Sequence, residues 1–201
     1  QAFYRVLPAQ VYNLYGPTEA TIDVSCWHCR IEKDHERVSI GKPISNIRFY
    51  VLDKEMNPVP IGIPGELWIG GSGLARGYLG NRLLTAAKFQ PDPFSGKPGE
   101  RMYRTGDKVR YRTDGNLEYL ERIDQQIKLR GFRIEPGDIE SALRSHGEVN
   151  DALVLLHQLQ NDEQLLIAYI IPEHIDLTGA TAYSTLLSSV NDHLRQKLPE
   201  Y

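Results

Sequence analysis

Short strand-like runs separated by turn residues fill the stretch from Ser39 to Arg122, and this alternation restricts the fold more than any other feature of the chain. Runs rich in β-branched and aromatic residues favour strands, whereas intervening Gly, Pro, Asn and Asp favour turns. Asp114-Gly115 lies between two such runs and is typical of a β-hairpin. The pattern predicts a short helix after Asn81 and strands over residues 48–52, 66–69, 108–112 and 116–120.

A different pattern begins after Ile123. Pro136 is placed to open a helix that Gly147 would end, and two strand-like runs follow at 152–157 and 165–171. A last helix is expected over 182–198, where one apolar stripe consists of Leu187, Val190, Leu194 and Leu198. The expected fold class is therefore mixed α and β, with a distorted β-barrel portion in residues 1–123 and a small α+β unit in residues 124–201.

The composition is that of an ordinary globular protein, with 41% hydrophobic and 24% charged residues. A net charge of -3 argues against a dedicated nucleic-acid-binding protein, whose affinity comes from clustered Lys and Arg. The apolar runs are too short to cross a bilayer. Cys26 and Cys29 alone cannot supply the four ligands of a structural zinc site, so reduced thiols are expected. We predict no nucleic-acid partner, no membrane association and a cytoplasmic location.

The segment from Asn13 to Glu19 contains residue types suited to a nucleotide. Gly16, followed by a proline, predicts a tight turn that a ligand can approach closely. Tyr15 offers a flat face to a nucleobase, and Thr18 offers a hydroxyl to a phosphate. The Glu19 carboxylate is a suitable oxygen ligand for Mg²⁺. Taken alone, the segment is equally well explained as a turn with a helix-capping Thr.

Later segments add weaker signals. The glycine-rich stretch at residues 70–78 lacks the Gly-Lys-Ser/Thr ending of a phosphate loop, so a structural loop is favoured there. The Asp107 carboxylate could accept hydrogen bonds from both ribose hydroxyls, and Arg122 could place a cation near ribose or phosphate. The alternative is a surface Asp in a turn beside a solvated Arg. Residues 126–135 alternate basic and apolar side chains, which by themselves favour a solvated strand and turn.

In this order and spacing, the segments resemble the adenylate-forming superfamily of acyl-CoA synthetases, luciferases and nonribosomal peptide synthetase adenylation domains. The adenylation domains match best, through Asn-Leu-Tyr-Gly-Pro-Thr-Glu-Ala-Thr from Asn13, Gly-Glu-Leu-Trp-Ile-Gly-Gly from Gly65 and Arg-Gly-Phe-Arg-Ile-Glu from Arg130. The resemblance extends from about Val11 to Tyr201. It implies that ATP and an amino acid form an aminoacyl-AMP, whose acyl group then passes to the phosphopantetheine thiol of a peptidyl carrier domain.

The resemblance also implies an ATP or AMP site with Mg²⁺. Tyr15 would stack on adenine, Asp107 would hold the ribose hydroxyls, and Glu19 would bind Mg²⁺. The full set of implied nucleotide-binding residues is Asn13, Tyr15, Gly16, Thr18, Asp107, Tyr119 and Arg122.

Other positions carry implied roles in transfer and selectivity. Asp124 matches the family's hinge, and Lys128, just beyond it, is expected to be catalytic. Glu121 stands where the family commonly has glycine, which puts the local turn before the hinge in doubt. The substrate-pocket positions within the chain are Leu14, Ile22 and Asp23, too few to name the amino acid.

Two alternatives remain open. A free-standing acyl- or aryl-CoA ligase shares the ATP motifs but delivers its acyl group to coenzyme A. A catalytically silent interaction module would use the small unit as a docking surface. A downstream carrier domain with an attachment serine would favour the peptide synthetase, and nucleotide binding would separate both ligases from the silent module.

The resemblance further implies parts that these 201 residues do not contain. They are an amino-terminal part with the phosphate loop and the Asp that holds the substrate amine, and a late catalytic lysine beyond the carboxyl end. We therefore predict that residues 1–201 alone do not adenylate an amino acid. Amino-acid-dependent pyrophosphate exchange measured on this polypeptide checks the prediction, and measurable exchange would contradict it.

Overall fold

The computed structural model describes residues 9–30, 38–124, 126–129, 132–159, 163–173 and 180–199. Internal contacts divide the chain into two compact units, Gln1–Asp124 and Gln125–Tyr201. The first unit is mostly β-structure and the second combines two antiparallel strand pairs with two helices, so the predicted mixed α and β fold class is confirmed. Among the described residues, no helix is long and apolar enough to cross a membrane.

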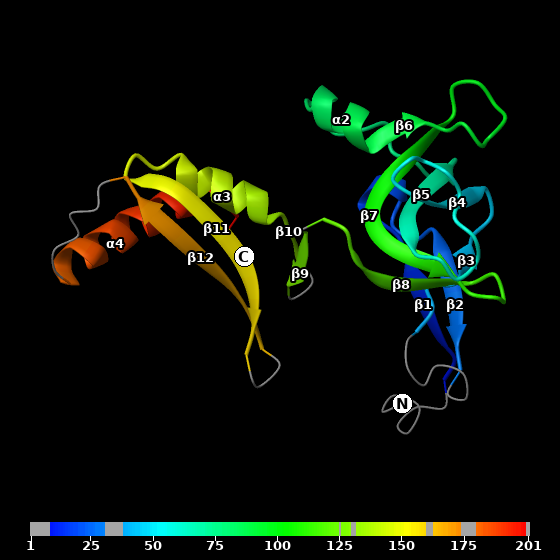
Figure 1. Cartoon of the computed structure of the whole chain (residues 1–201), viewed down its shortest axis with the longest axis horizontal. Coiled ribbons are helices and arrows are strands. Elements are labelled where there is room, and N and C mark those ends of the chain that lie inside the picture. Colours follow the sequence, from blue (N-terminus) through cyan, green and yellow to red (C-terminus); the bar gives the residue numbers. More distant parts are fainter. Residues whose placement is uncertain are drawn as a thin grey trace. The chain divides into compact units, whose positions relative to one another are not determined.

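The first unit contains an antiparallel five-stranded sheet, in the order β4-β5-β7-β6 with β8 paired to β7. Figure 1 shows β7 as a long, strongly curved strand that crosses this sheet. A smaller antiparallel sheet has the order β1-β2-β3. The strand bounds are β1 Val11–Tyr15, β2 Ser25–Cys29, β3 Lys42–Pro43, β4 Ile47–Leu52, β5 Gly65–Gly71, β6 Phe89–Pro91, β7 Arg101–Tyr111 and β8 Leu117–Arg122.

The four strands predicted in this unit are confirmed as β4, β5, β7 and β8. The predicted short helix is α2, Arg82–Lys88, and the Asn81 side chain caps it by accepting a bond from the Leu84 N–H at 3.0 Å. The sequence placed the start of β7 seven residues too late, at Lys108 instead of Arg101. The reason is Gly106, which interrupts the strand pattern and has a φ of 76°.

Gly106 lies in a bulge of β7. Glu66 of β5 pairs with Lys108, but Trp68 pairs with Arg104, so three residues of β7 lie opposite one residue of β5. A bulge of this kind bends its strand and increases the local twist. The hydroxyl of Thr105, inside the bulge, donates to the Leu67 carbonyl at 2.7 Å, which replaces part of the interrupted ladder. The curvature of β7 in Figure 1 follows from this interruption.

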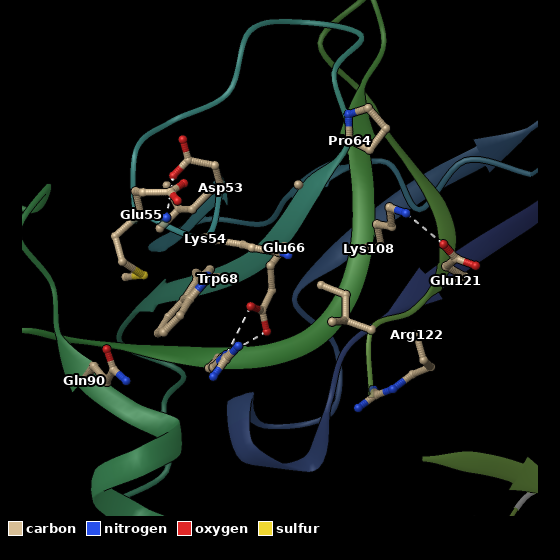
Figure 2. A pocket seen from close by; sticks show the side chains of 15 residues that line it. Asp53, Lys54, Glu55, Pro64, Glu66, Trp68, Gln90, Lys108, Glu121 and Arg122 are labelled. Atoms are coloured by element: carbon tan, nitrogen blue, oxygen red, sulfur yellow. Dashed lines mark hydrogen bonds and ion pairs between the residues drawn. The ribbon is translucent and has the colours of Figure 1, made fainter. Parts of the chain in front are cut away.

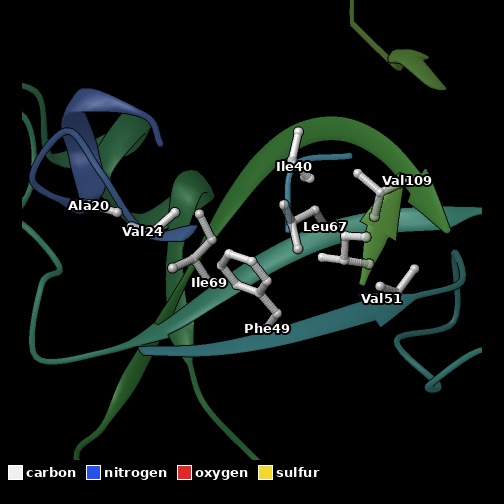
Figure 3. Close-up of a cluster of buried hydrophobic side chains, with 9 residues drawn as sticks. Ala20, Val24, Ile40, Phe49, Val51, Leu67, Ile69 and Val109 are labelled. Carbon is white, nitrogen blue, oxygen red and sulfur yellow. The ribbon is translucent and has the colours of Figure 1, made fainter. Parts of the chain in front are cut away.

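Side chains of the five-stranded sheet, together with Ala20, Val24 and Ile40 from segments beside the smaller sheet, form the main core of the first unit (Figure 3). Leu67 and Ile69 of β5 are fully buried there against Phe49 of β4. Trp68 points to the opposite face of the sheet and packs with Leu52 and Met102. Each such side chain contributes roughly 1.5–3 kcal/mol on burial, so both faces of β5 stabilise the unit. The complete cluster in Figure 3 is Ala20, Val24, Ile40, Phe49, Val51, Leu67, Ile69, Val109 and Leu117.

The second unit begins with a short hairpin, β9 Ile127–Leu129 and β10 Phe132–Ile134. A longer antiparallel pair follows α3 and precedes α4. Both helices pack on one face of this pair, where Leu143 and Val154 belong to the same buried cluster as Val190. The bounds are α3 Pro136–Arg144, β11 Val149–Gln158, β12 Gln164–Pro172 and α4 Ala180–Lys197.

Two details of the second unit differ from the sequence predictions. Leu187 is 54% exposed, and Leu186 takes the inward position because it lies four residues before Val190, on the same helical line as Leu194. Helix α3 ends at Arg144 with Ser145 as its C-cap, three residues before the point that Gly147 suggested. The Ser145 N–H bonds the Ser141 carbonyl at 3.1 Å, so the helix closes without a glycine.

Because Leu186 is buried and Leu187 is exposed, alanine substitutions at these two positions should destabilise the protein to different extents. Leu186→Ala should lower the free energy of unfolding by about 2–5 kcal/mol, because it leaves a cavity in the buried cluster. Leu187→Ala should change it by no more than about 0.5 kcal/mol, because that side chain is mostly exposed. Urea unfolding of both variants measures the difference. Equal losses would mean that the stripe containing Leu187 faces the core after all.

Candidate functional site

Asp107 lies at the centre of a buried polar network in the first unit, and only 4% of its surface is exposed. The Tyr15 hydroxyl donates to one oxygen of its carboxylate, Oδ2. Arg122 Nη1 donates to the other oxygen, Oδ1, at 3.0 Å. The fold therefore joins β1, β7 and β8 at one carboxylate, and it brings together residues that lie 92 and 15 positions apart in the chain.

The bulge in β7 positions this carboxylate. The Asp107 N–H donates to the Thr105 hydroxyl at 2.9 Å, while that hydroxyl donates to the Leu67 carbonyl. In the ladder between β7 and β8, Asp107 lies directly opposite Arg122. Bulges commonly re-aim a side chain beside a functional site, and here the bulge aims a carboxylate at a guanidinium.

Burial keeps the phenols around Asp107 neutral. It is the largest cause that raises the pKa of Tyr15 well above its ordinary value, and the negative charge of Asp107 raises it further. The pKa of Tyr119, on β8, is raised for the same two reasons in the same order. Both hydroxyls therefore remain protonated near neutral pH, so Tyr15 acts as a hydrogen-bond donor to Asp107.

Arg122 also binds a second carboxylate, that of Asp124. Its Nε donates to Asp124 Oδ1 at 2.7 Å and its Nη2 donates to Oδ2 at 2.6 Å, which is a bidentate pair. Lys88 lies 3.8 Å from Asp124 Oδ2. A side chain at position 106 would collide with the Asp124 carboxylate, so the glycine there permits this close approach as well as the positive φ.

Glu19 occupies a short 3₁₀-helix, η1, which covers Thr18–Ala20 after β1. Its side chain is buried, with 6% of the residue exposed, and the Tyr78 hydroxyl donates to its Oε1 at 2.6 Å. Thr18 is exposed and makes no capping bond, so the helix-capping alternative is not what the structure shows. Gly16 sits where a Cβ would strike the Ile22 carbonyl, which explains the glycine in this tight loop.

Mg²⁺ bound to a nucleotide needs one or two protein carboxylates, because phosphates and water supply its other ligands. The Glu19 carboxylate fits that requirement. Among the described residues there is no group of three or more His, Cys, Asp or Glu that could hold a metal ion.

The remaining predicted residues lie apart from the Asp107 network. The Asn13 amide donates to the Ser39 carbonyl at 2.8 Å and so joins β1 to the loop before β3. The three predicted pocket residues, Leu14, Ile22 and Asp23, are all exposed. Ile22 has a φ of 71°, which is unusual for a β-branched residue, so the loop that presents it is conformationally strained.

Lys128 belongs to the second unit. It lies on β9, paired with Arg133 of β10. Its side chain, and residues 130 and 131, fall outside the described part of the structure. The catalytic role expected for Lys128 therefore stays a prediction.

A cavity of about 870 Å³ opens on the Trp68 face of the sheet (Figure 2). Charged pairs line it: Arg104 Nε bonds both oxygens of Glu66 at 2.9 and 3.1 Å, and Lys108 lies 2.9 Å from Glu121. Among the described side chains that line this cavity, Arg122 is the one that the sequence predicted for the site. Since three of its lining cations, Arg104, Lys108 and Arg122, are already paired with carboxylates, the cavity is a weak match for a phosphate.

Sequence reasoning missed two residues of the site. Tyr78, in the glycine-rich stretch assigned as a structural loop, reaches Glu19 across 59 positions of sequence. Thr105 supports Asp107 from within the bulge. A local motif cannot indicate a contact with a residue so distant in sequence. The Thr-Gly-Asp triplet could, however, have suggested a bulge, because an isolated glycine within a strand pattern often marks one.

Comparison with known proteins finds similar sequences over most of the chain. Residues 1–79 match the family described as AMP-binding enzyme. The chain is 52% identical over 170 residues to phosphinothricin tripeptide synthetase PhsB of Streptomyces viridochromogenes, covering 85% of the chain and 14% of that protein. It is 48% identical over 191 residues to malpinin synthetase of Mortierella alpina, covering 95% of the chain and 2% of that protein.

A solved structure shows the same relationship. NpsA-ThdA, an artificially fused adenylation-PCP di-domain nonribosomal peptide synthetase from Klebsiella oxytoca, matches with a TM-score of 0.73 and 29% identity. The match covers 97% of this chain and 35% of that one. The chain is thus homologous to the adenylation segment of nonribosomal peptide synthetases, and it spans only a small part of the curated relatives' length.

Proposed function

We propose that this chain supplies the nucleoside-binding wall, the metal carboxylate and the hinge of an enzyme that adenylates an amino acid for peptide synthesis. The supporting observation is the convergence of Tyr15 and Arg122 on the Asp107 carboxylate, because all three belong to motifs that the resemblance assigns to ATP. Residues 1–123 would belong to the large adenylation subdomain and residues 124–201 to the small one.

In the first half-reaction, a carboxylate oxygen of the amino acid attacks the α-phosphorus of ATP. The bond from that phosphorus to the bridging oxygen breaks, and pyrophosphate leaves. The chemistry requires positioning and charge stabilisation more than covalent help from the protein. Mg²⁺ held by Glu19 would supply positive charge at the phosphates, and Thr18, exposed at the start of η1, would donate its hydroxyl to one of them.

The nucleoside would lie along β1, β7 and β8. Tyr15 would stack on adenine, with Asn13 and Gly16 beside it. Asp107 would accept bonds from the ribose hydroxyls, while Arg122 and Tyr119 complete this side of the site. A carboxylate can accept about four hydrogen bonds. The ribose hydroxyls would therefore bond to Asp107 beside the Tyr15 hydroxyl, or would take its place on Oδ2.

In the second half-reaction, the phosphopantetheine thiol of a carrier domain attacks the acyl carbon, and AMP leaves. Asp124 would act as the hinge between the two half-reactions, and Lys128 would contribute to catalysis. Leu14, Ile22 and Asp23 would line part of the amino-acid pocket. The amino-acid substrate, the carrier domain and the amino-terminal part of the adenylation domain are the proposed partners, while inactivity of residues 1–201 alone and a cytoplasmic location remain sequence predictions.

A pair of substitutions at Tyr15 tests the nucleoside site in the full adenylating enzyme that contains this segment. Tyr15→Ala removes the stacking ring, worth about 1–3 kcal/mol, and should raise the KM for ATP by about 5- to 150-fold. Tyr15→Phe keeps the ring and removes only the bond to Asp107, so its effect should be smaller. Pyrophosphate exchange at varied ATP concentration measures both. Equal effects, or none, would contradict stacking on adenine.

The hinge is tested by comparing Asp124→Pro with Asp124→Ala. Both variants lose the pair with Arg122, but only proline fixes the backbone φ near −65°. We therefore expect Asp124→Pro to slow one half-reaction more than Asp124→Ala does, while the other half-reaction is affected equally. Separate assays of pyrophosphate exchange and carrier-domain loading give the two rates. Equal slowing of both by proline would count against a hinge.

The alternative function is that of an acyl- or aryl-CoA ligase, which would use the same nucleotide-binding residues. Acyl transfer to free coenzyme A, instead of to a carrier domain, would identify this alternative. The identity of 52% to a tripeptide synthetase favours the carrier-domain reaction.

A further inference from the structure

The glycine-rich loop between β5 and α2 has no part in the function proposed above, yet it is tied to η1 and the turn after it at three points. The Thr21 hydroxyl donates to the Gly73 carbonyl at 2.6 Å. The Ala75 N–H donates to the Glu19 carbonyl at 2.8 Å. The Tyr78 hydroxyl donates to the Glu19 carboxylate at 2.6 Å. Both the backbone and the side chain of Glu19 are therefore held by this one loop.

Tyr78 is itself firmly held. Its N–H donates to the Thr85 hydroxyl of α2 at 2.9 Å, and its ring meets the Phe89 ring edge-on, with centroids 5.7 Å apart. Gly77, with a φ of 144°, has no room for a Cβ beside Thr85. The hydroxyl is thus presented to Glu19 from a fixed position.

Arg101 of β7 fastens the middle of the same loop. Its guanidinium donates to the Ala75 and Arg76 carbonyls, both at 3.0 Å, and lies 5.4 Å from the centre of the Phe89 ring. The loop is consequently joined to β7, α2 and η1 together.

A glutamate side chain has three rotatable bonds, and ordering it costs conformational entropy. A hydrogen bond from a neutral donor to a carboxylate is stronger than one between neutral groups, so the Tyr78 hydroxyl favours one orientation of Glu19. A tyrosine hydroxyl is ordinarily protonated near neutral pH, so it can donate to this carboxylate.

We infer that Tyr78 is a positioning residue for the Glu19 carboxylate, and that the glycine-rich loop serves the metal side of the nucleotide site. The inference rests on the proposed function, in which Glu19 binds the Mg²⁺ that accompanies ATP. Tyr78 acts through Glu19 and touches neither nucleotide nor metal. Groups that orient a metal ligand typically change metal affinity or activity by about 10- to 100-fold when they are removed.

Tyr78→Phe in the full adenylating enzyme tests this inference. It removes one oxygen and keeps the ring that packs on Phe89. Mn²⁺ affinity, measured by electron paramagnetic resonance with a non-hydrolysable ATP analogue, should fall by about tenfold or more. The Mg²⁺ concentration that half-saturates pyrophosphate exchange should rise in parallel, and the KM for the amino acid should stay unchanged.

Tyr50→Phe is the matched control. The Tyr50 hydroxyl also donates to a buried carboxylate, that of Asp92 at 3.0 Å, but neither residue belongs to the proposed nucleotide site. We expect a similar loss of thermal stability in both variants and an unchanged Mn²⁺ affinity in Tyr50→Phe. An equal loss of metal affinity in Tyr50→Phe would make the effect a general structural one and would overturn the inference.

Glu19→Gln separates the inference from the function on which it rests. If Glu19→Gln weakens Mn²⁺ binding and Tyr78→Phe does not, Tyr78 has no positioning role while the proposed metal carboxylate stands. If Glu19→Gln leaves Mn²⁺ binding unchanged, the metal role of Glu19 fails, and the inference fails with it.

Discussion

The interaction on which the rest of this structure depends is the pairing of Asp107 with Arg122 across β7 and β8. Their side chains are 6% and 14% exposed, so each charge is largely removed from water and needs the other. The bulge at Thr105 to Asp107 bends β7 and holds Asp107 through the Thr105 hydroxyl, opposite Arg122. The same pair also contacts Tyr15 from the other sheet and Asp124 from the end of the unit. One bulged segment of β7 therefore contributes both to the curvature of the sheet and to the polar site.

The fold could be predicted from sequence wherever a local signal was strong. Asp114-Gly115 marked the hairpin between β7 and β8, and Asn81 marked the start of α2. The beginning of β7 was missed because Gly106 breaks the strand pattern in mid-strand, and only pairing with β5 on both sides of the bulge restores the strand. The Leu187 prediction was wrong for a related reason. Leu186 and Leu187 are equally apolar, and only packing into the buried cluster of the second unit decides which of them turns inward.

Part of the membership of the candidate site could be predicted from sequence, but its contacts could not. Motif order identified Tyr15, Asp107 and Arg122, and the structure joins these three directly. Nothing local to any motif indicates that Arg122 also binds Asp124, or that Tyr78 reaches Glu19. Such contacts depend on strand register and on the path of a loop, which are tertiary properties. Leu14, Ile22 and Asp23 lie near the network in sequence, yet their side chains are exposed rather than gathered around it.

The double pairing of Arg122 has a consequence for recombining segments of such enzymes. One guanidinium serves two carboxylates, and one of these carboxylates also accepts a hydroxyl from the beginning of the chain. In a chimaera of two such enzymes, a junction between residues 15 and 124 would take some of these interacting residues from one parent enzyme and the rest from the other. Exchanges that look harmless in a linear alignment could then leave a buried charge without its partner. Compatible crossover points lie outside this interval, where the two parents do not have to share a single network.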